Sequence, residues 1–189
     1  MTHHDLNSMI KSGEILTLAE PVKSLVGAGF SHIKPEDFET LLLRMFEALG
    51  FSGSLTPVTG DEGVDVLIEG MTGPIVVQCK RYEAGATIGA KDLREFLGAI
   101  VHAGAVHGYF VTTSTFSDQA TKFCQMHDNM TLIDGESLKR LFAVSVLHPA
   151  TNQQKTSDRG PDYEAKAKRL YEEYLEGLVK LRQQYRVLR

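Results

Sequence analysis

Apolar side chains recur at helical spacing in the first third of the chain. Between Lys34 and Leu49 they follow the i, i+3, i+4, i+7 stripe of an amphipathic helix. Pro35 suits the first turn of such a helix, and Gly50 suits its C-terminal stop. The stripe therefore predicts a helix that turns one face toward a core.

The pattern changes to strand spacing directly after this helix. Alternating and β-branched residues, separated by turn formers, predict three strands at about residues 54–58, 64–69 and 74–81. In the second strand the apolar Val64, Val66 and Ile68 stand at every other position. Because side chains of a strand point alternately to the two faces, we expect these three residues to share one face.

Helices and strands interleave through the rest of the core. Apolar patterns predict helices at about residues 88–102, 117–127 and 135–142, and strands at 109–112 and 131–133. The predicted element order is α-β-β-β-α-β-α-β-α. Interleaving of this kind predicts an α/β sandwich in which helices flank a mixed central sheet.

Both ends of the chain are expected to lie outside this core. Residues 1–30 carry only a weak pattern and are predicted to form an N-terminal helical extension to a domain at 31–147. Residues 148–161 are polar and contain Pro and Gly, which is the composition of a linker. Apolar residues return at helical spacing over 162–189, so we expect a C-terminal amphipathic helix that docks on another surface.

Bulk composition narrows the class of protein. Hydrophobic residues make up 42% and charged residues 23% of the chain, as in soluble globular proteins. No apolar run is long enough to cross a membrane, and the N-terminus lacks the pattern of a secretory signal. The two cysteines are too few for a disulfide framework or a cysteine-rich zinc site. We therefore expect a cytoplasmic protein with no membrane partner.

The net charge of −4 does not by itself favour a nucleic-acid-binding protein, since such domains are often strongly basic. Nucleases that hold a divalent metal ion with carboxylates can nevertheless be acidic, because the metal supplies local positive charge. The overall charge therefore leaves the partner open.

A cluster of polar residues at the second and third predicted strands carries the strongest chemical signal. Asp65 starts one strand, and Gln78-Cys79-Lys80 ends the strand that pairs with it. Magnesium prefers hard oxygen ligands, which the Asp65 carboxylate and the Cys79 backbone carbonyl would supply. Lys80 would orient the attacking water, and strand periodicity places Gln78 on the same face as Lys80. The arrangement predicts metal-assisted phosphodiester hydrolysis.

These residues resemble the Mrr-like branch of the PD-(D/E)xK nuclease superfamily, in which glutamine commonly takes the second acidic position. The resemblance extends from about Phe30 to Phe142. It rests on these segments: Phe38-Glu39, Thr59-Gly60-Asp61-Glu62-Gly63-Val64-Asp65, Gln78-Cys79-Lys80-Arg81-Tyr82, Leu93-Arg94-Glu95-Phe96-Leu97-Gly98-Ala99, Thr112-Thr113-Ser114, Phe116-Ser117 and Leu132-Ile133-Asp134-Gly135.

The resemblance implies a restriction-endonuclease-like αβββαβ core and DNA as the substrate. It implies that Asp65, Gln78 and Lys80 form the catalytic signature. It also implies that Glu39, on the first helix, helps Asp65 to hold one or two Mg²⁺ ions, for which Mn²⁺ can substitute. Double-strand cleavage needs two active sites, which indicates a homodimer.

Several polar residues near the cluster are candidates for DNA contacts. Arg81, Lys91 and Arg94 would bind phosphates, although acidic neighbours make a solvated face of mixed charge an equal alternative. The hydroxyls of Thr113 and Ser114 would reach phosphate oxygens, or would serve an ordinary turn at a strand end.

The hypothesis at this stage is a metal-dependent DNA endonuclease of the restriction or defence type. One alternative is a junction-resolvase-like nuclease. Another is a DNA-binding subunit that kept the fold and lost turnover. A third is a protein whose C-terminal helix recruits a partner, such as a specificity or ATPase subunit.

Overall fold

The computed structural model describes residues 30, 33–48, 51–57, 63–70, 72–82 and 85–147. The predicted N-terminal extension, apart from residue 30, lies outside the described residues. The predicted linker at 148–161 and the predicted C-terminal helix at 162–189 also lie outside them. These three assignments therefore stay predictions.

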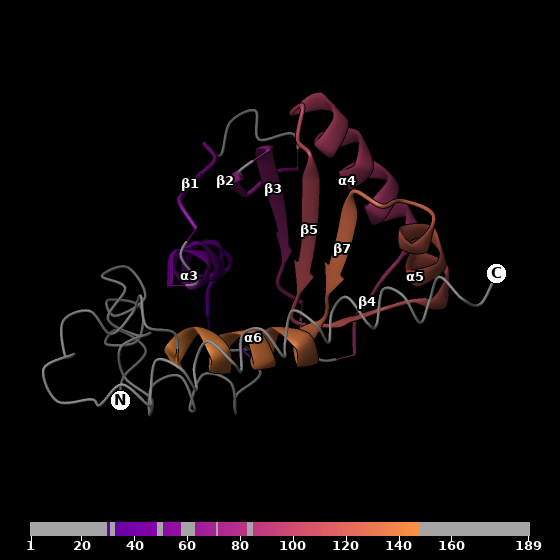
Figure 1. Cartoon of the computed structure of the whole chain (residues 1–189). Helices are drawn as coiled ribbons and strands as arrows, with labels where there is room; N and C mark the ends of the chain where they lie inside the picture. Colours follow the sequence, from indigo (N-terminus) through magenta and orange to yellow (C-terminus); the bar gives the residue numbers. More distant parts are fainter. Residues whose placement is uncertain are drawn as a thin grey trace, which may run out of the picture.

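A five-stranded mixed sheet forms the centre of the molecule (Figure 1). Its strands, in spatial order, are β1 (Gly53–Leu55), β2 (Val66–Gly70), β3 (Gly73–Lys80), β5 (His107–Thr112) and β7 (Met130–Ile133). Neighbours are antiparallel from β1 to β3 and parallel from β3 to β7. The predicted mixed sheet and its αβββαβ order are confirmed.

Helices cover both faces of the sheet, and each face has its own apolar cluster. Helices α3 (Pro35–Ala48) and α6 (Gly135–Leu147) share one cluster with Val66, Val77 and Val111. Helices α4 (Ala90–His102) and α5 (Asp118–Gln125) share the other with Val76 and Phe110. Figure 1 shows the two helix pairs on opposite sides of the strands. The sequence predicted all four helices at nearly these positions. In the described part of the chain, no helix has the length and apolar character needed to cross a membrane.

A second, two-stranded sheet was not predicted from the sequence. Strands β4 (Thr87–Ile88) and β6 (Thr115–Phe116) pair in parallel. Two residues are too few to produce a readable alternation, so this sheet depends on tertiary contacts. In the chain, β4 lies between β3 and α4, and β6 lies between β5 and α5.

Strand β5 and helix α4 approach each other closely at Gly108. A Cβ atom added to Gly108 would lie 2.4 Å from Ile100 Cδ1 and 2.8 Å from Phe96 Cζ. Only glycine leaves room for these two side chains at this point of the sheet. The absent side chain thus fixes how closely α4 packs on the strands.

Candidate active site

Asp65 lies at a local irregularity of the β2–β3 hairpin. Its backbone N–H donates to the Val77 carbonyl at 2.9 Å, and Val77 is already the register partner of Val66. Asp65 and Val66 therefore oppose one residue of β3, which is the arrangement of a β-bulge. The prediction that Val64 and Val66 share a face is wrong, because Val64 packs in the α4–α5 cluster and Val66 in the α3–α6 cluster.

The bulge brings the Asp65 carboxylate against β3. Asp65 Oδ2 accepts a hydrogen bond from the backbone N–H of Cys79 at 2.5 Å. A side-chain hydrogen bond also joins the Cys79 thiol to Asp65. One carboxylate thus holds both the main chain and the side chain of the residue between Gln78 and Lys80.

A second carboxylate, that of Glu39, also influences the Cys79 thiol. The pKa of this thiol is raised well above its ordinary value, first by burial and then by the negative charges of Asp65 and Glu39. Glu39 belongs to α3, which covers this face of the sheet. Of the three predicted metal-binding positions, Asp65 is hydrogen-bonded to Cys79, and Glu39 is close enough for its charge to act on the Cys79 thiol.

Gln78 and Lys80 alternate with Cys79 along β3 and so project to the other face of the strand. The Gln78 side-chain oxygen, Oε1, is buried and has no hydrogen-bond partner in the described part of the chain. Its amide nitrogen lies beside Gly63, where an added Cβ atom would come within 3.2 Å. Gly63 also has a φ of 84°, which favours glycine. The turn before Asp65 is thus shaped to admit the Gln78 amide, a signal that sequence patterning did not reveal.

Divalent metal would find suitable donors here. The described residues contain no cluster of three or more His, Cys, Asp or Glu side chains that could form a metal cage. Mg²⁺ in phosphate chemistry needs only one or two carboxylates, with waters and substrate oxygens completing its shell. Asp65 and Glu39 supply that number of carboxylates. The Gln78 oxygen, on the other face of β3, is a further buried acceptor.

The end of β5 holds the end of β3 in place. The buried Thr112 hydroxyl donates to the Lys80 carbonyl at 2.8 Å. The Thr113 hydroxyl accepts from the Tyr82 N–H and donates to the Tyr82 carbonyl, both at 3.0 Å. The Ser114 hydroxyl donates to the Ala86 carbonyl.

These contacts agree with the strand-end alternative for Thr113 and Ser114. Both hydroxyls are engaged with backbone groups of the chain itself. Thr112, which belongs to the same segment Thr112-Thr113-Ser114, likewise donates its hydroxyl to the chain's own backbone, at Lys80.

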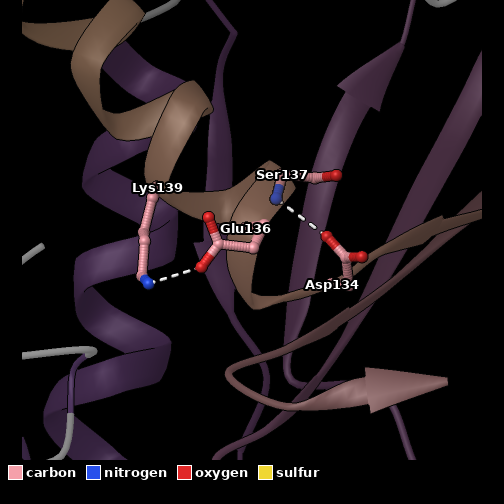
Figure 2. A network of polar contacts seen from close by, with 4 residues as sticks. All are labelled: Asp134, Glu136, Ser137 and Lys139. Atoms are coloured by element: carbon pink, nitrogen blue, oxygen red, sulfur yellow. Dashed lines mark hydrogen bonds and ion pairs between the residues drawn. The ribbon is translucent and has the colours of Figure 1, made fainter.

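The start of α6 is tied to the same corner of the molecule. Figure 2 shows Asp134 accepting from the Ser137 N–H, at 2.8 Å, and Glu136 paired with Lys139. The Gly135 N–H donates to the Ser114 carbonyl at 2.9 Å. The motif Asp134-Gly135 therefore begins a helix and fastens it to the turn after β5.

The two basic residues predicted on α4 have partners within the protein. Lys91 Nζ lies 3.7 Å from Glu95 Oε1 on an exposed face. The Arg94 guanidinium lies 6.0 Å from the centre of the Phe123 ring on α5. Both contacts favour the alternative of a solvated face of mixed charge. Arg81, which follows Lys80 directly, is half-buried.

Comparison with known proteins identifies the family. A family model described as a restriction endonuclease, Mrr_cat, matches residues 30–142, which is more than half of the chain. The chain belongs to this restriction endonuclease family. The match covers every element described above except the last residues of α6.

Individual relatives agree with this family. The chain is 31% identical over 155 residues to the type IV methyl-directed restriction enzyme EcoKMrr of Escherichia coli strain K12, covering 77% of this chain and 50% of that one. Among solved structures, it is similar to the DNA modification-dependent restriction endonuclease AspBHI, with a TM-score of 0.54 and 21% identity over 75% of this chain and 40% of that one. The predicted restriction-endonuclease-like fold is confirmed. The chain spans about half the length of EcoKMrr.

Proposed function

We propose that this member of the restriction endonuclease family is a metal-dependent DNA endonuclease that hydrolyses phosphodiester bonds in defence. One observation carries the proposal: the Asp65 carboxylate is bonded to the Cys79 backbone, between Gln78 and Lys80, while the charge of Glu39 acts on the same thiol. The carboxylates of Asp65, before β2, and Glu39, on α3, together with Lys80 at the end of β3, are the kinds of group that metal-assisted hydrolysis uses. The defence role is supported by the likeness to EcoKMrr.

Each residue has a distinct part in the proposed reaction. Asp65 and Glu39 would hold Mg²⁺, or Mn²⁺ in its place, together with the Cys79 carbonyl. The bound metal supplies polarisation of the scissile phosphate and a more acidic water. Lys80 positions the attacking water and stabilises the negative charge that develops on the phosphate. Gln78 donates an amide hydrogen to that water or to a phosphate oxygen, and the cleaved strand keeps a 5′-phosphate.

The proposal extends to the setting of the enzyme. Cutting both strands of a duplex requires two active sites, so we propose a homodimer. The two cysteines, which are free thiols, fit a reduced cytoplasmic location. A specificity or ATPase subunit is a further partner in this proposal.

Plasmid cleavage tests the proposal directly. Supercoiled plasmid is incubated with the wild type in Mg²⁺, Mn²⁺ or EDTA, and with Asp65→Asn and Lys80→Ala. We expect metal-dependent nicking that either substitution abolishes. Lys139→Ala serves as the matched lysine control, because Lys139 pairs with Glu136 on α6. A wild type that leaves unmodified, methylated and branched DNA intact in every metal would overturn the proposal.

A further inference from the structure

Tyr82 is an exposed aromatic residue next to the candidate active site. It follows Lys80 by two positions, and 39% of its surface is accessible to solvent. Aromatic side chains usually bury most of their area, since burial of the ring is strongly favourable. The exposed part of the ring, beside the candidate active site, is therefore available to a substrate.

The backbone of Tyr82 is fixed although its side chain is exposed. The Thr113 hydroxyl holds both the N–H and the carbonyl of Tyr82, each at 3.0 Å. Just before this, the Lys80 carbonyl accepts from the Thr112 hydroxyl and from the Thr113 N–H. Residues 80–82 thus continue alongside the end of β5 after the regular pairing stops. Little conformational entropy is left to lose when a ligand meets the ring.

We propose that Tyr82 stacks on an unstacked DNA base beside the scissile phosphate, and that Thr113 is the positioning residue that holds it there. This inference rests on the proposed nuclease function. Two residues of extended chain span roughly 6.6 Å, which is about two base steps at 3.4 Å each along one strand. The ring therefore reaches a base within two steps of the nucleotide whose phosphate Lys80 would contact. Aromatic stacking accepts any base, so the contact selects DNA in which a base is already free of its neighbours.

Binding and cleavage of short duplexes test this role. One duplex is fully paired and one carries a single mismatch, and affinity is measured by anisotropy in EDTA while cleavage is measured in Mg²⁺. For the wild type we expect tighter binding to the mismatched duplex. Tyr82→Ala should weaken that binding about tenfold, within the range for loss of one stacked base. Tyr82→Phe keeps the ring and should bind as the wild type does.

Three comparisons separate stacking from other causes. Phe51→Ala removes an equally exposed ring (37%) that packs on Phe46, and should leave DNA affinity unchanged. Tyr82→Ala should leave the dependence of affinity on salt unchanged, since a neutral ring displaces no counterion. Thr113→Val should weaken binding in the wild type but have no further effect in the Tyr82→Ala background, because Thr113 acts through Tyr82.

The outcomes distinguish this inference from the function on which it rests. If the wild type cuts DNA and Tyr82→Ala binds the mismatched duplex as tightly as the wild type does, the stacking role is overturned and the nuclease stands. Equal losses in Tyr82→Phe and Tyr82→Ala would also overturn it, because the hydroxyl would then make the contact. A wild type that neither binds nor cuts any DNA would overturn both.

Discussion

The carboxylate of Asp65 and the backbone N–H of Cys79 form a hydrogen bond of 2.5 Å across the β2–β3 hairpin. This bond occupies the place where the bulge interrupts the regular backbone ladder. Asp65 therefore stabilises the hairpin in addition to its proposed role with metal. The two roles can be separated by the choice of substitution.

Asp65→Asn should strongly reduce cleavage and leave stability nearly intact, because an amide oxygen still accepts from the Cys79 N–H. Activity should fall by about 10²–10³-fold, as when a group that stabilises the transition state is removed. Asp65→Ala should lose the same activity and in addition about 1–3 kcal/mol of unfolding free energy, since the Cys79 N–H is left unpaired. Urea denaturation in EDTA compares the two variants. Equal stability of Asn and Ala variants would contradict the structural role.

The raised pKa of the Cys79 thiol predicts a specific pH dependence of stability. In the unfolded chain this thiol ionises near its ordinary value, about 8.5, whereas the folded protein keeps it neutral to higher pH. The contribution of the neutral Cys79 thiol to the free energy of unfolding is therefore complete below the thiol pKa of the unfolded chain. This contribution declines as the pH rises toward the thiol pKa of the folded protein, with a slope of at most about 1.4 kcal/mol per pH unit.

Urea denaturation from pH 7.5 to 10 in EDTA measures this dependence. Cys79→Ser carries no group that titrates in this range, so its unfolding free energy should fall less steeply than that of the wild type. Parallel curves for the two proteins would show that burial and the charges of Asp65 and Glu39 do not hold the thiol neutral.

Gly108→Ala should destabilise the protein by about 1–3 kcal/mol through overpacking against Ile100 and Phe96. Gly98→Ala is the matched control, because Gly98 lies on the exposed side of α4 and an added Cβ atom would meet nothing within 4 Å. The control should gain about 0.5–1 kcal/mol, since alanine favours helix more than glycine does. Thermal unfolding checks both, and a neutral Gly108→Ala would mean that α4 can move off the sheet.

The basic residues should differ in how they affect the salt dependence of DNA binding. Arg81→Gln should lower the slope of log affinity against log salt by about one, because Arg81 follows Lys80 and is proposed to contact one phosphate. Lys91→Ala and Arg94→Gln should leave the slope unchanged, since these side chains pair with Glu95 and Phe123. Anisotropy titrations at several salt concentrations measure the slopes. A lower slope for Lys91→Ala would place α4 in the DNA interface.

Sequence patterning predicted those parts of the fold that depend on local periodicity. The stripe between Lys34 and Leu49 became α3, and the β-branched run around Val76 became β3. Patterning failed at Val64, because alternation in the sequence continues through a bulge that only pairing with Val77 creates. It also missed β4 and β6, which are too short to show a period.

In the candidate site, too, some residues could be predicted from the sequence and others could not. Asp65, Gln78 and Lys80 could be named as candidates from sequence, because metal-assisted hydrolysis uses those residue types at the ends of paired strands. The uses of Thr113 and Arg94 could not, since each depends on a partner far along the chain, Tyr82 and Phe123 respectively. Hydroxyls and guanidinium groups bind protein and DNA equally well, so their residue type alone does not identify the partner.

The bulged hairpin also bears on how the protein folds. Asp65 and Lys80 stand fifteen positions apart in one antiparallel hairpin, whereas Ile75 of β3 must find His107 of β5 across an intervening helix. Closing the shorter loop costs less entropy, so the hairpin can form early and the parallel pairing later. The register between carboxylate and lysine is then established before β5 arrives. The Thr112 and Thr113 hydroxyls then fix the end of β3 against β5, after the spacing of Asp65 and Lys80 has been set within the hairpin.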